Sequence, residues 1–331
     1  MVLFLQMMLF FPLFSCSESS GEGEIDTNSI VSVKFGDPFI VEHQGIYYMY
    51  GTSGSSKVHY GIEVLQSTDL KKWSVPEGAI NGYALHRDNA WGNDNFWAPE
   101  VYYVGNKFYM FYTSEEHLAI AVSNSPVGPF METGDMPLIK SNKAIDSHLF
   151  VDDDGRKYMY YVAFTNGNVI WMCEMNDDYV SVKSNTTKQC FGVSQAWEDS
   201  NLQPYAHAKV TEGAYILKHN GIYYLVYSAN HFENPNYGIG YATASLPTGP
   251  WTKYDGNPII AGNDGIKGTG HCAFFTDSEG SLNVVYHSHF SDRSVQPRVV
   301  HINKCRFVSN PAGGADILEI IDPRIVPVME K

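Results

Sequence analysis

The stretch TEGAYILKHNGIYYLVYS, residues 211–228, predicts a β-hairpin. Residues 214–217 are a short apolar run, and residues 223–227 are aromatic and apolar again. The Asn-Gly pair at 220–221 separates the two runs and readily takes the positive φ angles of a tight hairpin turn. Glu212 stands just before the first run. A carboxylate at the end of a buried strand is costly unless it has a partner or a chemical role.

The same pattern occurs five times along the chain. Each copy reads as an apolar strand, a turn and an aromatic strand, and the turn glycine recurs every 50 to 66 residues. The five copies span residues 37–50, 98–112, 146–161, 211–228 and 270–286. Repeats of this size, each built from several short strands, are typical of propeller blades. We therefore predict an all-β fold, a five-bladed β-propeller that forms a single domain over residues 30–331.

Composition and charge limit the function. The 331 residues include 22 Tyr, 18 Phe and 29 Gly, a mix that favours strands and turns over helices. The formal net charge of -14 argues against nucleic-acid binding, because phosphate needs a basic face. A neutral or weakly charged ligand is easier to reconcile with this charge.

The N-terminal residues predict export. Residues 2–14 are almost wholly apolar but too short to span a bilayer, as in a signal-peptide core, although no basic residue precedes them. Residues 13–16, Leu-Phe-Ser-Cys, resemble a bacterial lipobox, in which Cys16 becomes the lipidated first residue. Residues 1–15 would then be a lipoprotein signal peptide and residues 16–29 a flexible tether. This interpretation places the protein in the periplasm or on the outer-membrane surface; an ordinary cleaved signal is the alternative, and it also exports the chain.

Two further features leave alternatives open. Four cysteines after Cys16 could form disulfides in three connectivities, or remain buried free thiols (Cys173, Cys190, Cys272 and Cys305). Residues 81–95 and 177–209 are the longest stretches outside the repeat, and such insertions usually shape the binding face of a repeat scaffold.

Acidic residues stand at the heads of three of the predicted inner strands. The first strand of each propeller blade lines the central channel, so these heads should meet at one mouth. Counting back from the turn glycines places Asp37, Asp146 and Glu212 at corresponding positions, with Trp97 and His271 in the other two blades. Two carboxylates facing across a cleft are the machinery of glycoside hydrolysis, and a third can raise the pKa of the acid by like-charge repulsion. Turn or capping acids that bind backbone amides are the alternative for each acid alone.

From about Val33 to the C-terminal strand, the chain resembles glycoside hydrolase family 43, the five-bladed propeller hydrolases of arabinose- and xylose-containing glycans. The resemblance rests on the motifs Gly-Asp-Pro-Phe at 36–39, Trp-Ala-Pro-Glu at 97–100, Ile-Asp-Ser at 145–147, Thr-Glu-Gly at 211–213 and Gly-His at 270–271. It implies that Asp37 is the general base and Glu212 the general acid. It implies that Asp146 modulates the pKa of the acid and orients it. The family inverts configuration, so the carboxyl groups of Asp37 and Glu212 should stand roughly 6.5–9.5 Å apart.

The resemblance implies three more site residues. Trp97 would wall the subsite of the reacting sugar, Arg298 would contact the hydroxyls of that sugar, and His271 would lie near the channel axis. In some members this histidine helps to hold a calcium or other ion through water, but one histidine does not make a calcium site. A blade-core tryptophan, a solvated or salt-bridged arginine and a core histidine are the alternatives. The chemistry itself requires no cofactor.

The sequence thus predicts an exported inverting glycosidase that cleaves α-L-arabinofuranosyl or β-D-xylosyl linkages in plant cell-wall polysaccharides. Family members with β-xylosidase activity often carry an extra C-terminal β-sandwich, for which this chain is too short, so an arabinofuranosidase is favoured. The expected partner is an arabinose- or xylose-containing oligo- or polysaccharide, with no nucleic acid and with membrane contact through a lipid anchor alone. The alternatives are an endo-arabinanase, a related propeller glycosidase acting on another glycan such as galactan, and a non-catalytic glycan-binding surface propeller.

Overall fold

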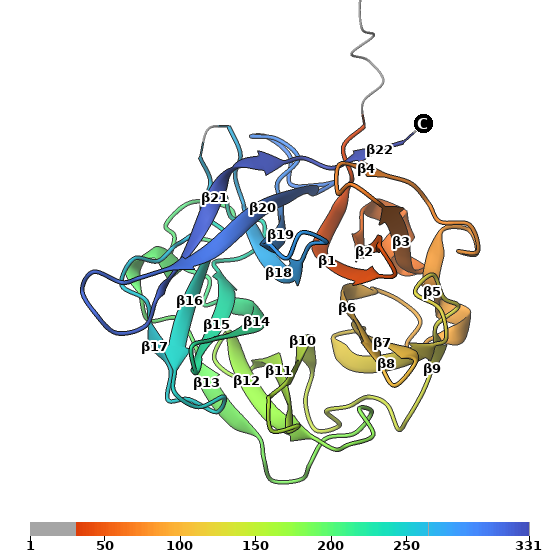
Figure 1. Ribbon diagram of the computed structural model, residues 1–331, viewed down its shortest axis with the longest axis horizontal. Coiled ribbons are helices and arrows are strands. Elements are labelled where there is room, and N and C mark those ends of the chain that lie inside the picture. The colour runs from red at the N-terminus through yellow and green to blue at the C-terminus, as the bar shows by residue number, and fades with distance from the viewer. Residues whose placement is uncertain (1–30, 264, 331) are drawn as a thin grey trace, which may run out of the picture. The chain divides into compact units, whose positions relative to one another are not determined.

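The computed structural model describes residues 31–330 apart from residue 264, so the predicted signal peptide, Cys16 and the tether lie outside the described residues. Five four-stranded antiparallel sheets stand around a central axis as the blades of a propeller (Figure 1). The predicted all-β five-bladed fold is confirmed. In the described part of the chain, no helix is long and apolar enough to cross a membrane.

In every blade the chain runs outward from the axis, one strand after another. Blades one and two consist of β1 (Phe35–His43), β2 (Ile46–Ser53), β3 (Gly61–Ser67) and β5 (Tyr83–His86), then β6 (Trp97–Val104), β7 (Lys107–Ser114), β8 (His117–Ser123) and β9 (Met131–Glu132). Blades three and four consist of β10 (Ala144–Val151), β11 (Lys157–Phe164), β12 (Asn168–Met175) and β13 (Lys188–Phe191), then β14 (Thr211–His219), β15 (Ile222–Ala229), β16 (Gly238–Ala244) and β17 (Thr252–Lys253). Blade five consists of β18 (Gly270–Thr276), β19 (Leu282–Ser288), β20 (Val299–Val308) and β21 (Ile317–Ile325).

The C-terminal segment ties blade five to the start of the chain. The short strand β22 (Val328–Met329) pairs in parallel with β4 (Lys72–Trp73), which follows β3. The amide of Val33 donates to the Pro327 carbonyl, and the Val33 carbonyl accepts from the amide of Val300. These contacts join the first and last blades and close the ring.

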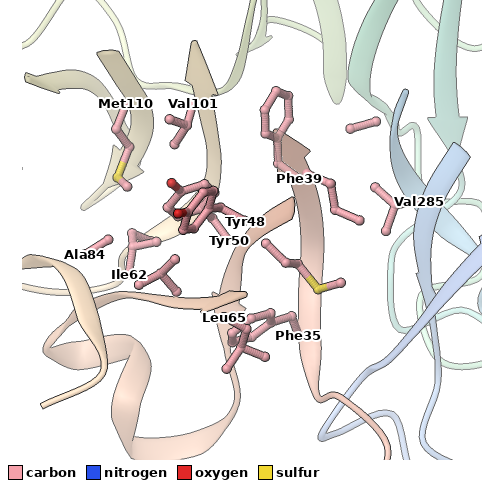
Figure 2. Close-up of a cluster of buried hydrophobic side chains, with 14 of the residues drawn as sticks. Phe35, Phe39, Tyr48, Tyr50, Ile62, Leu65, Ala84, Val101, Met110 and Val285 are labelled. Carbon is pink, nitrogen blue, oxygen red and sulfur yellow. The ribbon is translucent and has the colours of Figure 1, made fainter. Parts of the chain in front are cut away.

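Apolar faces of neighbouring blades pack together to form the core. Figure 2 shows one such cluster, in which Phe39 of β1, Val101 of β6 and Val285 of β19 come from three different blades. Met49, Tyr50 and Ile62 in the same cluster are fully buried. Burying one large apolar side chain contributes about 1.5–3 kcal/mol, so the blades stabilise one another chiefly through these contacts.

The two presumed insertions are partly blade structure. Residues 81–95 supply β5, the outermost strand of blade one, and residues 177–209 supply β13, the outermost strand of blade three. The interpretation of both stretches as insertions outside the repeat was therefore wrong in part. Sequence counting missed these strands because they have only four residues each and sit at the outer edge, where few apolar positions are required.

The cysteines of the described chain are free thiols, and Cys173, Cys272 and Cys305 are buried. The disulfide alternative is thus not realised among these residues. Burial raises the pKa of each of these three thiols, so they are poorly reactive.

Candidate active site

Each inner strand carries a β-bulge near its head. The register of the first hairpin of every blade shifts there, and the residue at the shift has a positive φ of 43° to 57° (Asp37, Ala98, Asp146, Gly213 and His271). Residues other than glycine rarely adopt this conformation, and bulges of this kind re-aim side chains near active sites. The heads of the inner strands are therefore built to direct side chains into one cavity.

Hydrogen bonds between neighbouring blades hold these bulges in place. In four cases, a polar side chain at the end of the second strand of one blade accepts a hydrogen bond from the bulge amide of the next blade. The acceptors are Thr52 (from Ala98, 2.9 Å), Thr113 (from Asp146, 3.2 Å), Ser228 (from His271, 2.7 Å) and His287 (from Asp37, 3.0 Å). In blade three the corresponding residue is Val162, whose apolar side chain cannot accept a hydrogen bond. At that junction the amide of Gly213 lowers the pKa of Asp146, as a donor facing the carboxyl group does. Direct hydrogen bonds to the bulge amides thus connect four of the five pairs of neighbouring blades.

Glu212 does not occupy the same position as the other two acids. It lies opposite Ser228 in its hairpin, as Gly36 lies opposite Thr52 and Trp97 lies opposite Thr113. Asp37 and Asp146 each stand one residue later, on the bulge itself. Counting from the turn glycines was wrong by one residue because the turns differ in length.

The three acids nevertheless meet in one cavity of about 410 Å³, and each is 8–9% exposed. Trp97, His271 and Arg298 line the same cavity, so all six residues singled out from the sequence come together. Among residues that sequence reasoning missed, the lining includes Thr52, Phe164, Asn168, His231 and Phe232. The signal for Thr52 was its place at the end of a second strand, facing the head of the inner strand.

The carboxylate of Asp37 is held in its ionised form. Arg298 donates to both oxygens of Asp37, at 2.7 and 3.1 Å, and the Thr52 hydroxyl donates to one of them at 2.5 Å. His271 and His287 lie 3.3 and 3.6 Å from the same carboxylate. Burial by itself would raise the pKa of Asp37, but the Arg298 guanidinium and these neighbours outweigh it and hold the pKa below its ordinary value.

In contrast to Asp37, the carboxyl group of Glu212 has a pKa above its ordinary value. Burial, and to a lesser extent the negative charge of Asp37, raise its pKa to about 7, against hydrogen bonds that lower it. The Tyr237 hydroxyl donates to Oε1 at 2.9 Å, and the Asn168 amide donates to Oε2 at 3.0 Å. Glu212 therefore keeps a proton to nearly neutral pH while Asp37 stays ionised.

Asp146 is the third buried carboxyl group of the cavity. Burial first, and then the charges of Glu212 and Asp37, raise its pKa well above the ordinary value. Its Oδ2 lies 3.8 Å from Nδ1 of His271. Two buried carboxyls that repel each other in this way titrate as a pair, so a change at Asp146 is felt at Glu212.

Arg298 and His271 have protein partners in the cavity. Besides its contacts to Asp37, the guanidinium of Arg298 lies over the ring of Phe232, 5.1 Å from the centroid, and its Nε atom is buried without a partner among the described residues. Burial lowers the pKa of His271. Arg298 thus belongs to the immediate surroundings of the proposed base, and its salt-bridged alternative is realised.

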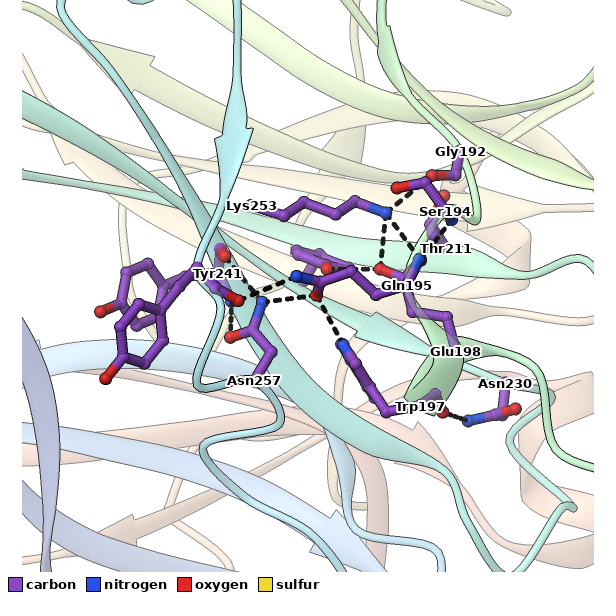
Figure 3. Close-up of polar contacts among 12 residues, drawn as sticks. Gly192, Ser194, Gln195, Trp197, Glu198, Thr211, Asn230, Tyr241, Lys253 and Asn257 are labelled. Carbon is purple, nitrogen blue, oxygen red and sulfur yellow. Dashed lines mark hydrogen bonds and ion pairs between the residues drawn. The ribbon is translucent and has the colours of Figure 1, made fainter.

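The cavity wall at His231 and Phe232 is supported from behind by a buried polar network. Figure 3 shows Lys253 pairing with Glu198, at 2.5 and 2.8 Å, and Asn230 donating to the carbonyl of Trp197. Asn230 directly precedes the wall residues. The network therefore fixes the segment from which they project.

The described residues do not supply a calcium shell. No group of three or more His, Cys, Asp or Glu side chains among them is arranged to hold a metal ion. His271 offers a single nitrogen, whereas calcium prefers six to eight oxygens. The predicted ion near the channel axis does not fit the protein donors alone, and no chemical step is assigned to it.

An ionised carboxylate and a protonated carboxylic acid that face one cavity form the paired machinery of a glycoside hydrolase. Comparison with known proteins gives the same class: residues 26–310 match the family described as glycosyl hydrolases family 43. The chain therefore belongs to glycosyl hydrolases family 43.

Individual relatives differ in the sugar named. The chain is similar to a crystal structure described as an endo-1,4-beta-xylanase of Bacteroides thetaiotaomicron, with 42% identity, a TM-score of 0.81, and coverage of 92% of this chain and 99% of that one. It is also similar to a thermostable family-43 glycoside hydrolase, with 36% identity, a TM-score of 0.78, and coverage of 91% and 97%. Among curated proteins, a beta-D-galactofuranosidase of Aspergillus niger is 27% identical over 81% of this chain and 76% of the relative.

Proposed function

We propose that this glycoside hydrolase cleaves α-L-arabinofuranosyl, or β-D-xylosyl, linkages in plant cell-wall polysaccharides with inversion of configuration. The observation that carries the proposal is that two buried carboxyl groups in unlike surroundings line one cavity: Asp37 is paired with Arg298, whereas Glu212 has no paired cation among the described residues and its pKa is raised by burial. An inverting mechanism needs one carboxylate to take a proton from water and one carboxylic acid to give a proton to the leaving oxygen.

In the proposed reaction, a water molecule attacks the anomeric carbon from the face opposite the leaving group, and Asp37 accepts a proton from that water. The bond from the anomeric carbon to the glycosidic oxygen breaks as Glu212 donates its proton to that oxygen. The products are the released sugar, with inverted configuration, and an alcohol. Proton exchange with solvent then returns Asp37 to its ionised form and Glu212 to its protonated form.

The other site residues support the two acids. Asp146 is proposed to tune the pKa of Glu212 through their mutual repulsion, and to orient the acid through Gly213, the next residue after Glu212, whose amide lowers the pKa of Asp146. Trp97 is proposed to wall the reacting sugar, since it lines the cavity beside the base. His271 and Arg298 are proposed to complete this subsite.

The choice of sugar rests on the relatives. An arabinofuranoside and a β-D-galactofuranoside share the configuration of the furanose ring and differ in the exocyclic carbon, so the relative from Aspergillus niger favours a furanoside. The relative described as a xylanase favours a xyloside. An exported, lipid-anchored location through Cys16 is part of the proposal, because plant polysaccharide lies outside the cell.

The experiment that tests the proposed function is a substrate panel. Wild type is assayed on aryl α-L-arabinofuranoside, aryl β-D-xyloside, aryl β-D-galactofuranoside, linear arabinan, arabinoxylan and xylan, with Asp37→Asn and Glu212→Gln as controls. Release of arabinose or xylose by wild type, lost in Asp37→Asn, is expected. Cleavage of polymers without cleavage of aryl glycosides would indicate endo action. Binding of these glycans without hydrolysis of any would support the non-catalytic alternative instead.

A further inference from the structure

Tyr237 is the buried partner of the acid. Its hydroxyl donates to Oε1 of Glu212 at 2.9 Å, and its side chain is fully buried. A Cβ on Gly270 would lie 2.0 Å from the Tyr237 ring, so the ring occupies the space that this glycine leaves free. On another side the ring stacks on His287, with centroids 5.7 Å apart and an angle of 23° between the planes. Tyr237 is thus fixed in one orientation.

The direction of the Tyr237 hydrogen bond follows from its chemistry. A phenol has one proton to give, and its hydroxyl lies 2.9 Å from the carboxyl oxygen Oε1 of Glu212, which is a strong acceptor. Tyr237 therefore donates to Oε1 of Glu212.

We infer that Tyr237, held by its packing against Gly270 and His287, is a positioning residue that keeps Oε1 of Glu212 as an acceptor, so that the acid carries and delivers its proton from Oε2. The inference rests on the proposed function and deepens it, because it names the oxygen that faces the leaving group. Oε2 accepts from the amide of Asn168 at 3.0 Å, on the blade-three side of the cavity. A hydroxyl oxygen can carry a proton and accept a hydrogen bond at the same time, so this contact is compatible with a proton on Oε2. The glycosidic oxygen consequently receives its proton from that side.

The position of the proton is tested first without turnover. Infrared difference spectra between wild type and Glu212→Gln isolate the carbonyl stretch of protonated Glu212, and the titration of this band gives the pKa. If Oε1 is the carbonyl that accepts from Tyr237, Tyr237→Phe raises the stretching frequency and raises the pKa of Glu212, because a hydrogen bond to the charged form is lost. Tyr215→Phe is the matched control, because Tyr215 is a nearby tyrosine whose hydroxyl donates to the Phe274 carbonyl.

Kinetics provide the second arm. Tyr237→Phe should lower kcat for an oligosaccharide on the order of tenfold, a fraction of the 10²–10⁴ that general acid catalysis supplies. For a 2,4-dinitrophenyl glycoside, whose leaving group needs no proton, kcat should fall much less. Gly270→Ala should reproduce this pattern, because its methyl group displaces the Tyr237 ring. An unchanged or lowered carbonyl frequency in Tyr237→Phe, or equal losses on both substrates, would overturn the inference. If the wild-type enzyme hydrolyses no glycoside, the proposed function is wrong. The infrared result would still show whether Tyr237 positions the proton of Glu212.

Discussion

The guanidinium of Arg298 occupies the space above the α-carbon of Gly36. A Cβ at position 36 would lie 1.8 Å from Cζ of Arg298, far inside van der Waals contact. Gly36 directly precedes Asp37, to which Arg298 is paired. The glycine is required for space, so that the arginine can reach the base across the inner strand.

Gly36→Ala should therefore fold but lose activity. Displacement of Arg298 breaks its paired contacts with Asp37, and misplacement of a catalytic group by about 1 Å costs about 10²-fold in rate. The same change raises the pKa of Asp37, since the guanidinium favours the ionised form. The acidic limb of the pH profile of kcat/KM should move to higher pH. Gly45→Ala, where a Cβ meets nothing within 4 Å, is the control for loss of a glycine, although its φ of 80° adds some backbone strain.

The basic limb of the same profile should follow Glu212. The acid must be protonated to act, and its pKa is raised to about 7, so kcat/KM should fall as pH rises through about 7. Glu212→Gln should abolish turnover of natural glycosides while retaining some activity on 2,4-dinitrophenyl glycosides, and that residual activity should lack the basic limb. Natural substrates turned over by Glu212→Gln at the wild-type rate would remove Glu212 as the acid.

Asp146→Asn should shift this basic limb to lower pH. The charge of Glu212 raises the pKa of Asp146. Because this repulsion acts on both carboxyl groups, we expect its loss in Asp146→Asn to lower the pKa of Glu212. Activity near neutral pH should fall by about 10²-fold, because the acid is then both more ionised and less well oriented. The pH dependence of kcat/KM is the readout; a basic limb that stays in place speaks against a pKa-tuning role.

Phe164 should bind the leaving-group sugar. It lies directly opposite Asn168 in the ladder between β11 and β12, lines the cavity and is 43% exposed. If Glu212 delivers its proton from Oε2, the leaving-group sugar lies on the side of the cavity where Asn168 and Phe164 stand. Phe164→Ala should therefore raise KM for an oligosaccharide by about tenfold, as expected for a lost ring contact. KM for the matching glycosyl fluoride, whose leaving group is a single atom, should not change. Phe290→Ala, another exposed phenylalanine, serves as control; an equal rise in KM for both substrates would contradict the assignment.

Lys253→Met should destabilise the fold much more than loss of a surface ion pair. Glu198 is fully buried, and Lys253 is its charged partner with only 8% of its side chain exposed. Removing one member of a buried pair leaves an uncompensated charge and costs about 3–5 kcal/mol in the free energy of unfolding. Lys140→Met, which breaks an exposed pair with Asp135, should cost less than about 1 kcal/mol. Urea unfolding of both variants gives the comparison, and equal losses would contradict it.

The repeat pattern was enough to predict the propeller, because alternating strands and glycine turns are local features of the sequence. It also brought Asp37, Asp146 and Glu212 to one place, since the topology of the fold gathers the heads of the inner strands. The offset of Glu212 could not be predicted, because the hairpin turns have two or five residues and the count back from a turn glycine changes with them. Tyr237 and His287 could not be predicted either. Tyr237 contacts Glu212 and packs against Gly270, and His287 accepts from the amide of Asp37, so both touch site residues without lining the cavity. Such contacts leave no mark on the spacing of the sequence.

The central claim is that Asp37 and Glu212 hydrolyse a glycosidic bond in one displacement. Proton NMR of the first sugar released by wild type tests it most directly, before mutarotation mixes the anomers. The account predicts β-L-arabinofuranose from an α-L-arabinofuranoside, or α-D-xylose from a β-D-xyloside. A first product that keeps the configuration of its substrate would mean a covalent intermediate, and it would contradict the roles given to both residues.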